Sequence, residues 1–146
     1  MNIKDILIQA DAIQVGVAVE RWQDAIQLAA EPLIRGGYIE PRYRDAIITS
    51  TQKNGAYYVF EDEHLAIPHA RPECGVLENG FSLVTLQTPV SIAGSSAVDI
   101  LILFGATDSN THIQEGLTVI FRMLDDENRL QALRCASSKQ EVIAIL

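Results

Sequence analysis

The run from Val98 to Phe104 sets the tightest limit on what this chain can fold into. It is apolar at every position except Asp99. A strand that faces water on one side alternates apolar and polar residues, so this run is typical of a central strand buried on both faces. Such a strand needs a packed layer on each side. We therefore expect an α/β fold in which one β-sheet carries helices on both faces.

The other periodic segments supply the helices and the remaining strands. Gly36-Gly37 and Asn54-Gly55 are typical helix ends, while Thr111-x-x-Gln114 and Ser138-x-x-Glu141 are capping boxes at helix starts. Helices are predicted over Ile3–Gln9, Arg21–Arg35, Pro41–Lys53, His112–Leu124, Asn128–Cys135 and Lys139–Leu146. Strands are predicted over Tyr57–Phe60, Phe81–Leu86 and Val98–Phe104, with Ala12–Val17 as an edge strand.

Composition narrows the class of protein. The chain has 146 residues, 48% of them hydrophobic, which suits one compact domain. A net charge of −8 with scattered basic residues argues against nucleic-acid binding. The start is acidic rather than basic and apolar, and no apolar run approaches the ~20 residues of a membrane helix. We expect a cytoplasmic protein in which Cys74 and Cys135 are reduced thiols.

The most informative motif is the histidine of Pro68-His69-Ala70-Arg71. Proline fixes the backbone before His69, and the small Ala70 leaves its ring approachable by another protein. Imidazole is a good nucleophile toward phosphorus near neutral pH, because one ring nitrogen attacks while the other holds a proton. A phosphoryl group on that ring needs nearby hydrogen-bond donors, and Arg71 offers a planar, positively charged guanidinium with several N–H groups. The motif indicates a phosphohistidine, although a lone histidine is more often ordinary surface.

A second anion site is predicted just after the buried strand, in Asp108-Ser109-Asn110-Thr111-His112. With Thr111 as N-cap, His112 falls in the first helical turn, beside free backbone amides and the positive end of the helix dipole. The dipole contributes only about 0.3 to 1 kcal/mol per charge, so it assists phosphoryl binding without creating it. The plain alternatives are a polar residue filling the turn at His112 and a solvated charge at Arg71.

Two other chemistries compete for the same residues. His64, His69 and His112 with Glu61 or Glu63 offer zinc ligands, but His64 and His69 are five apart, and an odd spacing on an extended segment points them to opposite faces. A nucleophilic Cys74 with help from Arg71 is a second rival. No oxyanion-hole motif accompanies it, so an incidental cysteine is preferred.

The chain also resembles a known family along nearly its whole length. Leu65-Ala66-Ile67-Pro68-His69-Ala70 looks like the phosphohistidine signature of enzyme IIA domains of the fructose–mannitol superfamily of the bacterial phosphotransferase system (PTS). Further blocks resemble the ascorbate-specific IIA subgroup and its cryptic mannitol-type relatives: Trp22-Gln23-Asp24-Ala25, Glu40-Pro41-Arg42-Tyr43, Ala56-Tyr57-Tyr58-Val59, Pro68-His69-Ala70-Arg71-Pro72-Glu73 and Asp108-x-Asn110-x-His112.

This resemblance implies a single EIIA type-2 domain over residues 1–146, with one mixed β-sheet flanked by helices on both faces. His69 would receive a phosphoryl group from the general histidine phosphocarrier protein and pass it to a cysteine of a cognate IIB protein, and so serve a IIC permease indirectly. His112 would stabilise the phosphoryl group. No cofactor or metal is implied, and a homodimer is a further candidate assembly.

The resemblance does not decide which pathway the protein serves or which basic residue contacts the phosphoryl group. Ascorbate import is the expected pathway, with a mannitol-like substrate or a regulatory, phosphorylation-switched binding protein as alternatives. The mannitol branch has a phosphate-facing arginine upstream, where this chain has Lys53, so either Lys53 or Arg71 takes that role. Family members often carry glycine near Asp62, and Glu63 falls where the mannitol branch has an acid.

Overall fold

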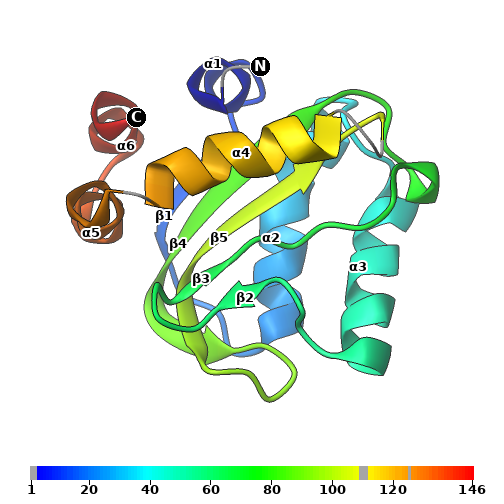
Figure 1. Ribbon diagram of the computed structural model, residues 1–146, viewed down its shortest axis with the longest axis horizontal. Helices are drawn as coiled ribbons and strands as arrows, with labels where there is room; N and C mark the ends of the chain where they lie inside the picture. Colours follow the sequence, from blue (N-terminus) through cyan, green and yellow to red (C-terminus); the bar gives the residue numbers. More distant parts are fainter. Residues whose placement is uncertain (1–2, 109–111, 125) are drawn as a thin grey trace.

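The chain folds around one mixed β-sheet (Figure 1). The computed structural model describes residues 3–108, 112–124 and 126–146, and for residues 112, 113, 115, 119, 123, 124 and 127 it describes the backbone alone. In the described residues the sheet has five strands in the order β1-β4-β5-β3-β2. They are β1 (Ile13–Val17), β2 (Val59–Phe60), β3 (Leu65–Ala66), β4 (Gly80–Ser91) and β5 (Ala97–Gly105).

Parallel and antiparallel pairs alternate across the sheet. β1 runs parallel to β4 and β3 parallel to β5, whereas β4–β5 and β2–β3 are antiparallel. The prediction of an α/β fold with a single mixed sheet is therefore confirmed. β1 lies at an edge, as its sequence pattern predicts.

Helices cover both faces of this sheet. They are α1 (Ile3–Gln9), α2 (Trp22–Arg35), α3 (Pro41–Asn54), α4 (His112–Leu124), α5 (Glu127–Cys135) and α6 (Lys139–Ile145), with a 3₁₀ turn, η1, at Pro72–Cys74. Figure 1 shows α4 crossing in front of the sheet, while α2, with α3 beside it, lies behind. Within the described ranges, none of the helices combines the length and apolar character needed to cross a bilayer.

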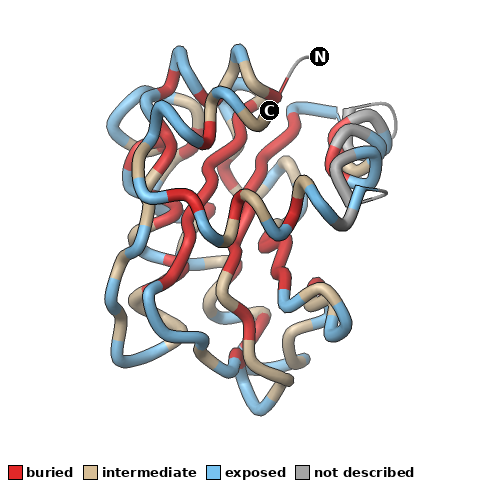
Figure 2. Tube along the Cα trace, turned by 90° about the vertical axis from the view of Figure 1, so that its left-hand side faces the viewer, coloured by how far each residue is buried: buried red, intermediate tan, exposed pale blue. Residues whose placement is uncertain are grey.

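β5 is the central strand that the apolar run predicts. It is third of the five described strands, and residues 100–104 are at most 1% exposed. Figure 2 shows buried segments running through the middle of the molecule, with exposed segments around them. Asp99, the polar exception, pairs with Arg134 of α5 through a 2.6 Å contact between its Oδ2 and the guanidinium Nε.

The structure departs from the predicted elements where they are short. β3 and η1 were not predicted, because two or three residues carry no readable period. β2 begins at Val59 rather than Tyr57, and β4 runs on to Ser91 through an irregularity in its pairing with β5.

The helix caps were predicted in part. The hydroxyl of Ser138 accepts the amide of Glu141, as the capping box requires. The carboxylate of Glu141 returns to the amide and hydroxyl of Ser137 instead of the amide of Ser138. The box at Thr111 lies outside the described residues.

Candidate histidine site

The ends of two parallel strands position His69. β3 pairs with β5 in the register Leu65–Ile100, and the amide of Phe104 continues this pairing by donating to the carbonyl of Pro68 at 3.2 Å. Proline at position 68 cannot donate a ladder bond of its own, so the chain leaves the sheet there. His69 is therefore held at the carboxyl ends of β3 and β5, the usual place for chemistry in an open α/β sheet.

Two aromatic rings flank the imidazole of His69. Its centroid is 4.9 Å from that of Phe104 at an interplanar angle of 33°, and 5.5 Å from that of Tyr57 at 87°. Burial lowers the pKa of His69 below the ordinary 6.5, with a partial opposing effect from the carbonyl of Ile67. The ring is therefore uncharged at neutral pH.

A hydrogen bond within the loop decides which ring nitrogen of His69 is free. Nδ1 lies 2.8 Å from the carbonyl oxygen of Ile67. A carbonyl only accepts hydrogen bonds, so Nδ1 carries the proton of the neutral ring. The lone pair is then on Nε2. A neutral imidazole in this tautomer is ready to act as a nucleophile through Nε2.

Neither predicted cation forms a hydrogen bond with the His69 ring in the part of the chain that the structure describes. Arg71 is exposed at the start of η1, and its guanidinium makes no hydrogen bond or ion pair with the part of the chain that the structure describes. Lys53 is exposed in the last turn of α3. Arg71 lies two residues from His69 on the same segment, which makes it the nearer candidate along the chain.

The described part of α4 packs against Phe104, one of the two rings that flank His69. The side chain of His112 is outside the described residues, but its backbone begins α4. A Cβ added at Gly116, one turn later, would lie in ordinary van der Waals contact with the ring of Phe104, at 3.6 Å. The part of α4 around Gly116 therefore packs against the ring of Phe104, which lies beside His69.

The two competing chemistries find little support. His64 and Glu63 lie in the β2–β3 turn, at the opposite end of β3 from His69, and Nδ1 of His64 is 3.0 Å from the carbonyl oxygen of Ala97. Among the described residues no group of histidine, cysteine and acidic side chains is placed to hold a metal ion. Cys74 is a half-buried free thiol in η1.

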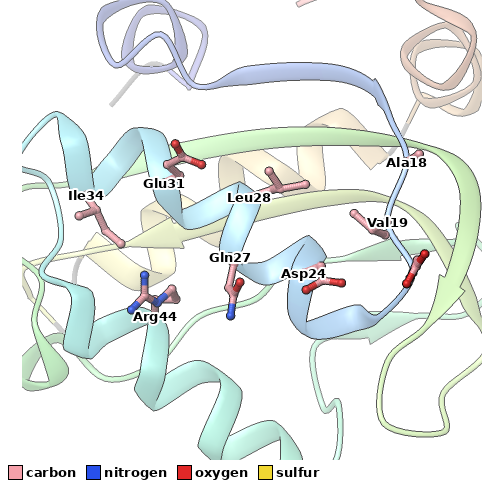
Figure 3. A pocket seen from close by; sticks show the side chains of 9 residues that line it. Ala18, Val19, Asp24, Gln27, Leu28, Glu31, Ile34 and Arg44 are labelled. Atoms are coloured by element: carbon pink, nitrogen blue, oxygen red, sulfur yellow. The ribbon is translucent and has the colours of Figure 1, made fainter.

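A separate hollow of about 570 Å³ lies along α2. Figure 3 shows Asp24, Gln27, Leu28 and Glu31 of α2 along it, with Arg44 of α3 opposite. No histidine or cysteine lines it, and it lies on the α2–α3 side of the sheet, away from α4.

Three residues around His69 were not predicted as part of the site. Phe104 was predicted only as core, Tyr57 only as a strand residue and Tyr43 only as an inward position of a helix. Their roles depend on which parts of the chain meet in space, and aromatic residues in apolar patterns give no local signal of that.

The fold and the site together define a class of protein: an α/β domain that presents an uncharged histidine at the ends of parallel strands, with one ring nitrogen free to carry a group. The comparisons give the family. Residues 6–146 match the family described as "Phosphoenolpyruvate-dependent sugar phosphotransferase system, EIIA 2". The chain belongs to this family. It is a phosphotransferase component of a sugar PTS, a phosphocarrier that relays a phosphoryl group through a histidine.

Relatives and solved structures agree with this assignment. The chain is 36% identical to the ascorbate-specific PTS system EIIA component of Shigella boydii over 100% of this chain and 96% of the relative. The solution structure of the mannitol-specific cryptic enzyme IIA CmtB of Escherichia coli is 34% identical, with a TM-score of 0.89, and the match covers 99% and 97% of the two chains.

A more distant structure shows a complex. It is that of enzyme IIA mannitol with phosphorylated enzyme IIB mannitol from Escherichia coli, at 28% identity and a TM-score of 0.78, covering 93% and 94% of the two chains.

Proposed function

We propose that His69 is the phosphorylated residue and that it carries the phosphoryl group on Nε2. The observation that carries this proposal is the 2.8 Å contact between Nδ1 and the carbonyl oxygen of Ile67, which leaves the lone pair on Nε2. The donor is the general histidine phosphocarrier protein, and the acceptor is a cysteine of a cognate IIB protein. The relay takes place in the cytoplasm.

Both steps balance without a cofactor. In the first, the Nε2 lone pair attacks the phosphorus of the donor's phosphohistidine, and a new N–P bond forms as the donor's N–P bond breaks. The donor imidazole keeps that electron pair. In the second, the IIB thiolate attacks the same phosphorus, an S–P bond forms and the pair of the broken bond returns to Nε2. Since Nδ1 keeps its proton bonded to Ile67, the His69 ring leaves as neutral imidazole.

The dianionic phosphoryl group needs positive partners while it is on the ring. Arg71 is the proposed cation, because it is close to His69 along the chain and its guanidinium is exposed. The first amides of α4 and the side chain of His112 are the proposed donors from the opposite side, since α4 packs on Phe104.

Ascorbate import is the proposed pathway. The support is the likeness over the whole chain to the ascorbate-specific component of Shigella boydii. A mannitol-type pathway is the second candidate, supported by the likeness to the cryptic mannitol enzyme IIA. Phosphoryl transfer occurs between proteins, so the choice between these pathways depends on the IIB partner rather than on sugar contacts.

Two matched histidine variants test the phosphorylation site. His69→Ala is expected to abolish labelling by phosphoenolpyruvate and the general PTS proteins, because it removes the nucleophile. His64→Ala is the control, since His64 lies at the other end of β3, and labelling should remain at the wild-type level. Full labelling of the His69 variant, or loss of labelling only in the His64 variant, would overturn the assignment.

A further inference from the structure

The peptide group that joins His69 to Ala70 is held at both of its polar atoms by tyrosine hydroxyls. The hydroxyl of Tyr57 donates to the carbonyl oxygen of His69 at 2.8 Å. The hydroxyl of Tyr43 accepts the amide of Ala70 at 2.9 Å. The two tyrosines come from separate elements, Tyr43 from α3 and Tyr57 from the segment before β2.

Tyr43 anchors this peptide group to the sheet. Its side chain is fully buried, and its hydroxyl lies 2.8 Å from the carbonyl oxygen of Phe104 and 3.2 Å from that of Ala70. The single hydroxyl proton goes to the closer acceptor, Phe104. One buried oxygen therefore links the His69 loop to the strand whose aromatic ring supports the imidazole.

Tyr57 differs because it is exposed. It is 58% exposed, yet its hydroxyl bonds inward to His69 and its ring packs edge-to-face on the imidazole. Burial of part of the ring raises the pKa of Tyr57 above its ordinary 10.0, so the hydroxyl stays a donor at neutral pH. Its ring also packs edge-to-face on Tyr58, with centroids 5.2 Å apart, so Tyr57 is supported from one side and reaches the histidine with both its ring and its hydroxyl.

We propose that Tyr57 and Tyr43 are positioning residues that grip the His69–Ala70 peptide group and so hold Nε2 in its attacking orientation. This inference rests on the proposed function of His69. Fixing both ends of the peptide group fixes the direction in which the His69 side chain leaves the backbone. The ring is then held against Phe104 while Nδ1 bonds Ile67. Without the hydrogen bonds from Tyr57 and Tyr43, the loop can turn and the Nδ1 proton loses its fixed acceptor.

Tyr57→Phe tests the proposal, because it removes the hydroxyl and keeps the ring. Tyr58→Phe is the matched control: Tyr58 is the next residue, and its buried hydroxyl bonds Thr51 at 2.7 Å instead of the histidine loop. Loss of one neutral hydrogen bond should slow transfer from the phosphorylated general phosphocarrier about twofold to tenfold. The loss should appear in kcat rather than KM, since the exposed ring that a partner meets is unchanged.

A spectroscopic measurement separates positioning from simple stability. In ¹⁵N spectra of the unphosphorylated protein, the wild type and Tyr58→Phe should show one His69 tautomer with Nδ1 protonated. Tyr57→Phe should show a mixture of tautomers. A wild-type rate and tautomer in Tyr57→Phe would overturn the inference, as would an equal loss in Tyr58→Phe. If the wild type is not labelled on His69, the proposed function itself fails, which is a different result.

Discussion

At the scale of single residues, the proposed chemistry depends on the tautomer and charge of His69. The imidazole is half-buried between Phe104 and Tyr57, and burial is the main cause of its lowered pKa. The carbonyl of Ile67 opposes the shift because it favours the protonated nitrogen it binds. The result is a ring that is neutral at pH 7 and still has a defined donor side and a defined nucleophilic side.

This environment predicts the pH dependence of phosphoryl acceptance. The pKa of folded His69 lies below 6.5, so the rate should rise with pH as the ring loses its proton and level off once the ring is neutral. An NMR titration of His69 should give a midpoint below 6.5. A midpoint above this value would contradict the buried, neutral ring.

The stability of the folded protein should also increase with pH over this range. As pH falls below 6.5, the unfolded chain takes up the proton before folded His69 does. The contribution of this histidine to the free energy of unfolding is therefore complete above pH 6.5 and declines as pH falls toward the folded pKa. His69→Ala should remove this part of the pH dependence.

At the scale of elements, hydrogen bonds from Arg134 connect α5 to the strands that lead to the site. The guanidinium of Arg134 bonds Oδ2 of Asp99 at 2.6 Å and the carbonyl oxygen of Glu63 at 2.7 Å. The side chains of Arg134 and Asp99 are 23% and 14% exposed. One arginine therefore joins α5, β5 and the β2–β3 turn.

Arg134→Met should destabilise the protein while keeping the apolar stem of the side chain. Hydrogen bonds to charged groups contribute about 1.5 to 3 kcal/mol, and the variant leaves a largely buried carboxylate without its cation. Lys139→Met is the control, because the Lys139–Asp11 pair is 49% and 71% exposed and such pairs contribute about 0 to 1 kcal/mol. Urea denaturation measures the free energy of unfolding of both variants. Equal losses of this free energy in the two variants would contradict the stabilising role of Arg134.

Sequence patterns found the helices and four of the five described strands, and missed β3 and η1. β5 and α2 have enough residues to display a period, so their place and type were predicted. β3 has two residues and is a strand only because β5 offers Ile100 and Leu101 as partners. Its existence depends on a contact between distant segments, which a local pattern does not contain.

The candidate site was predicted to a similar degree. His69 and Arg71 were proposed from the chemistry of their residue types, and their roles stay predictions. Tyr57 and Tyr43 could not be proposed in this way, since their hydroxyls serve the site only after α3 and the β2 region fold beside the loop. The side chain of His112 lies outside the described residues, so its predicted role stays a prediction.

At the scale of the whole molecule, the proposed relay makes the IIB partner decide the pathway. The net charge of −8 favours rapid encounter with basic partner surfaces, and we expect specificity to depend on the surface around His69. Purified IIB proteins of the ascorbate and mannitol types, offered side by side to the phosphorylated protein, measure this choice. We expect a higher kcat/KM for the ascorbate-type partner. A higher value for the mannitol-type partner would reassign the pathway and leave the phosphocarrier function intact.

The most direct test of the central claim is to locate the phosphorus atom in the phosphorylated protein. Phosphorus–nitrogen coupling in ¹⁵N-labelled phosphoprotein identifies both the histidine and its nitrogen. We predict phosphorus on Nε2 of His69 with Nδ1 still protonated, because Nδ1 is bonded to the carbonyl of Ile67. Phosphorus on Nδ1 of His69, on His112 or on Cys74 would contradict the proposed mechanism.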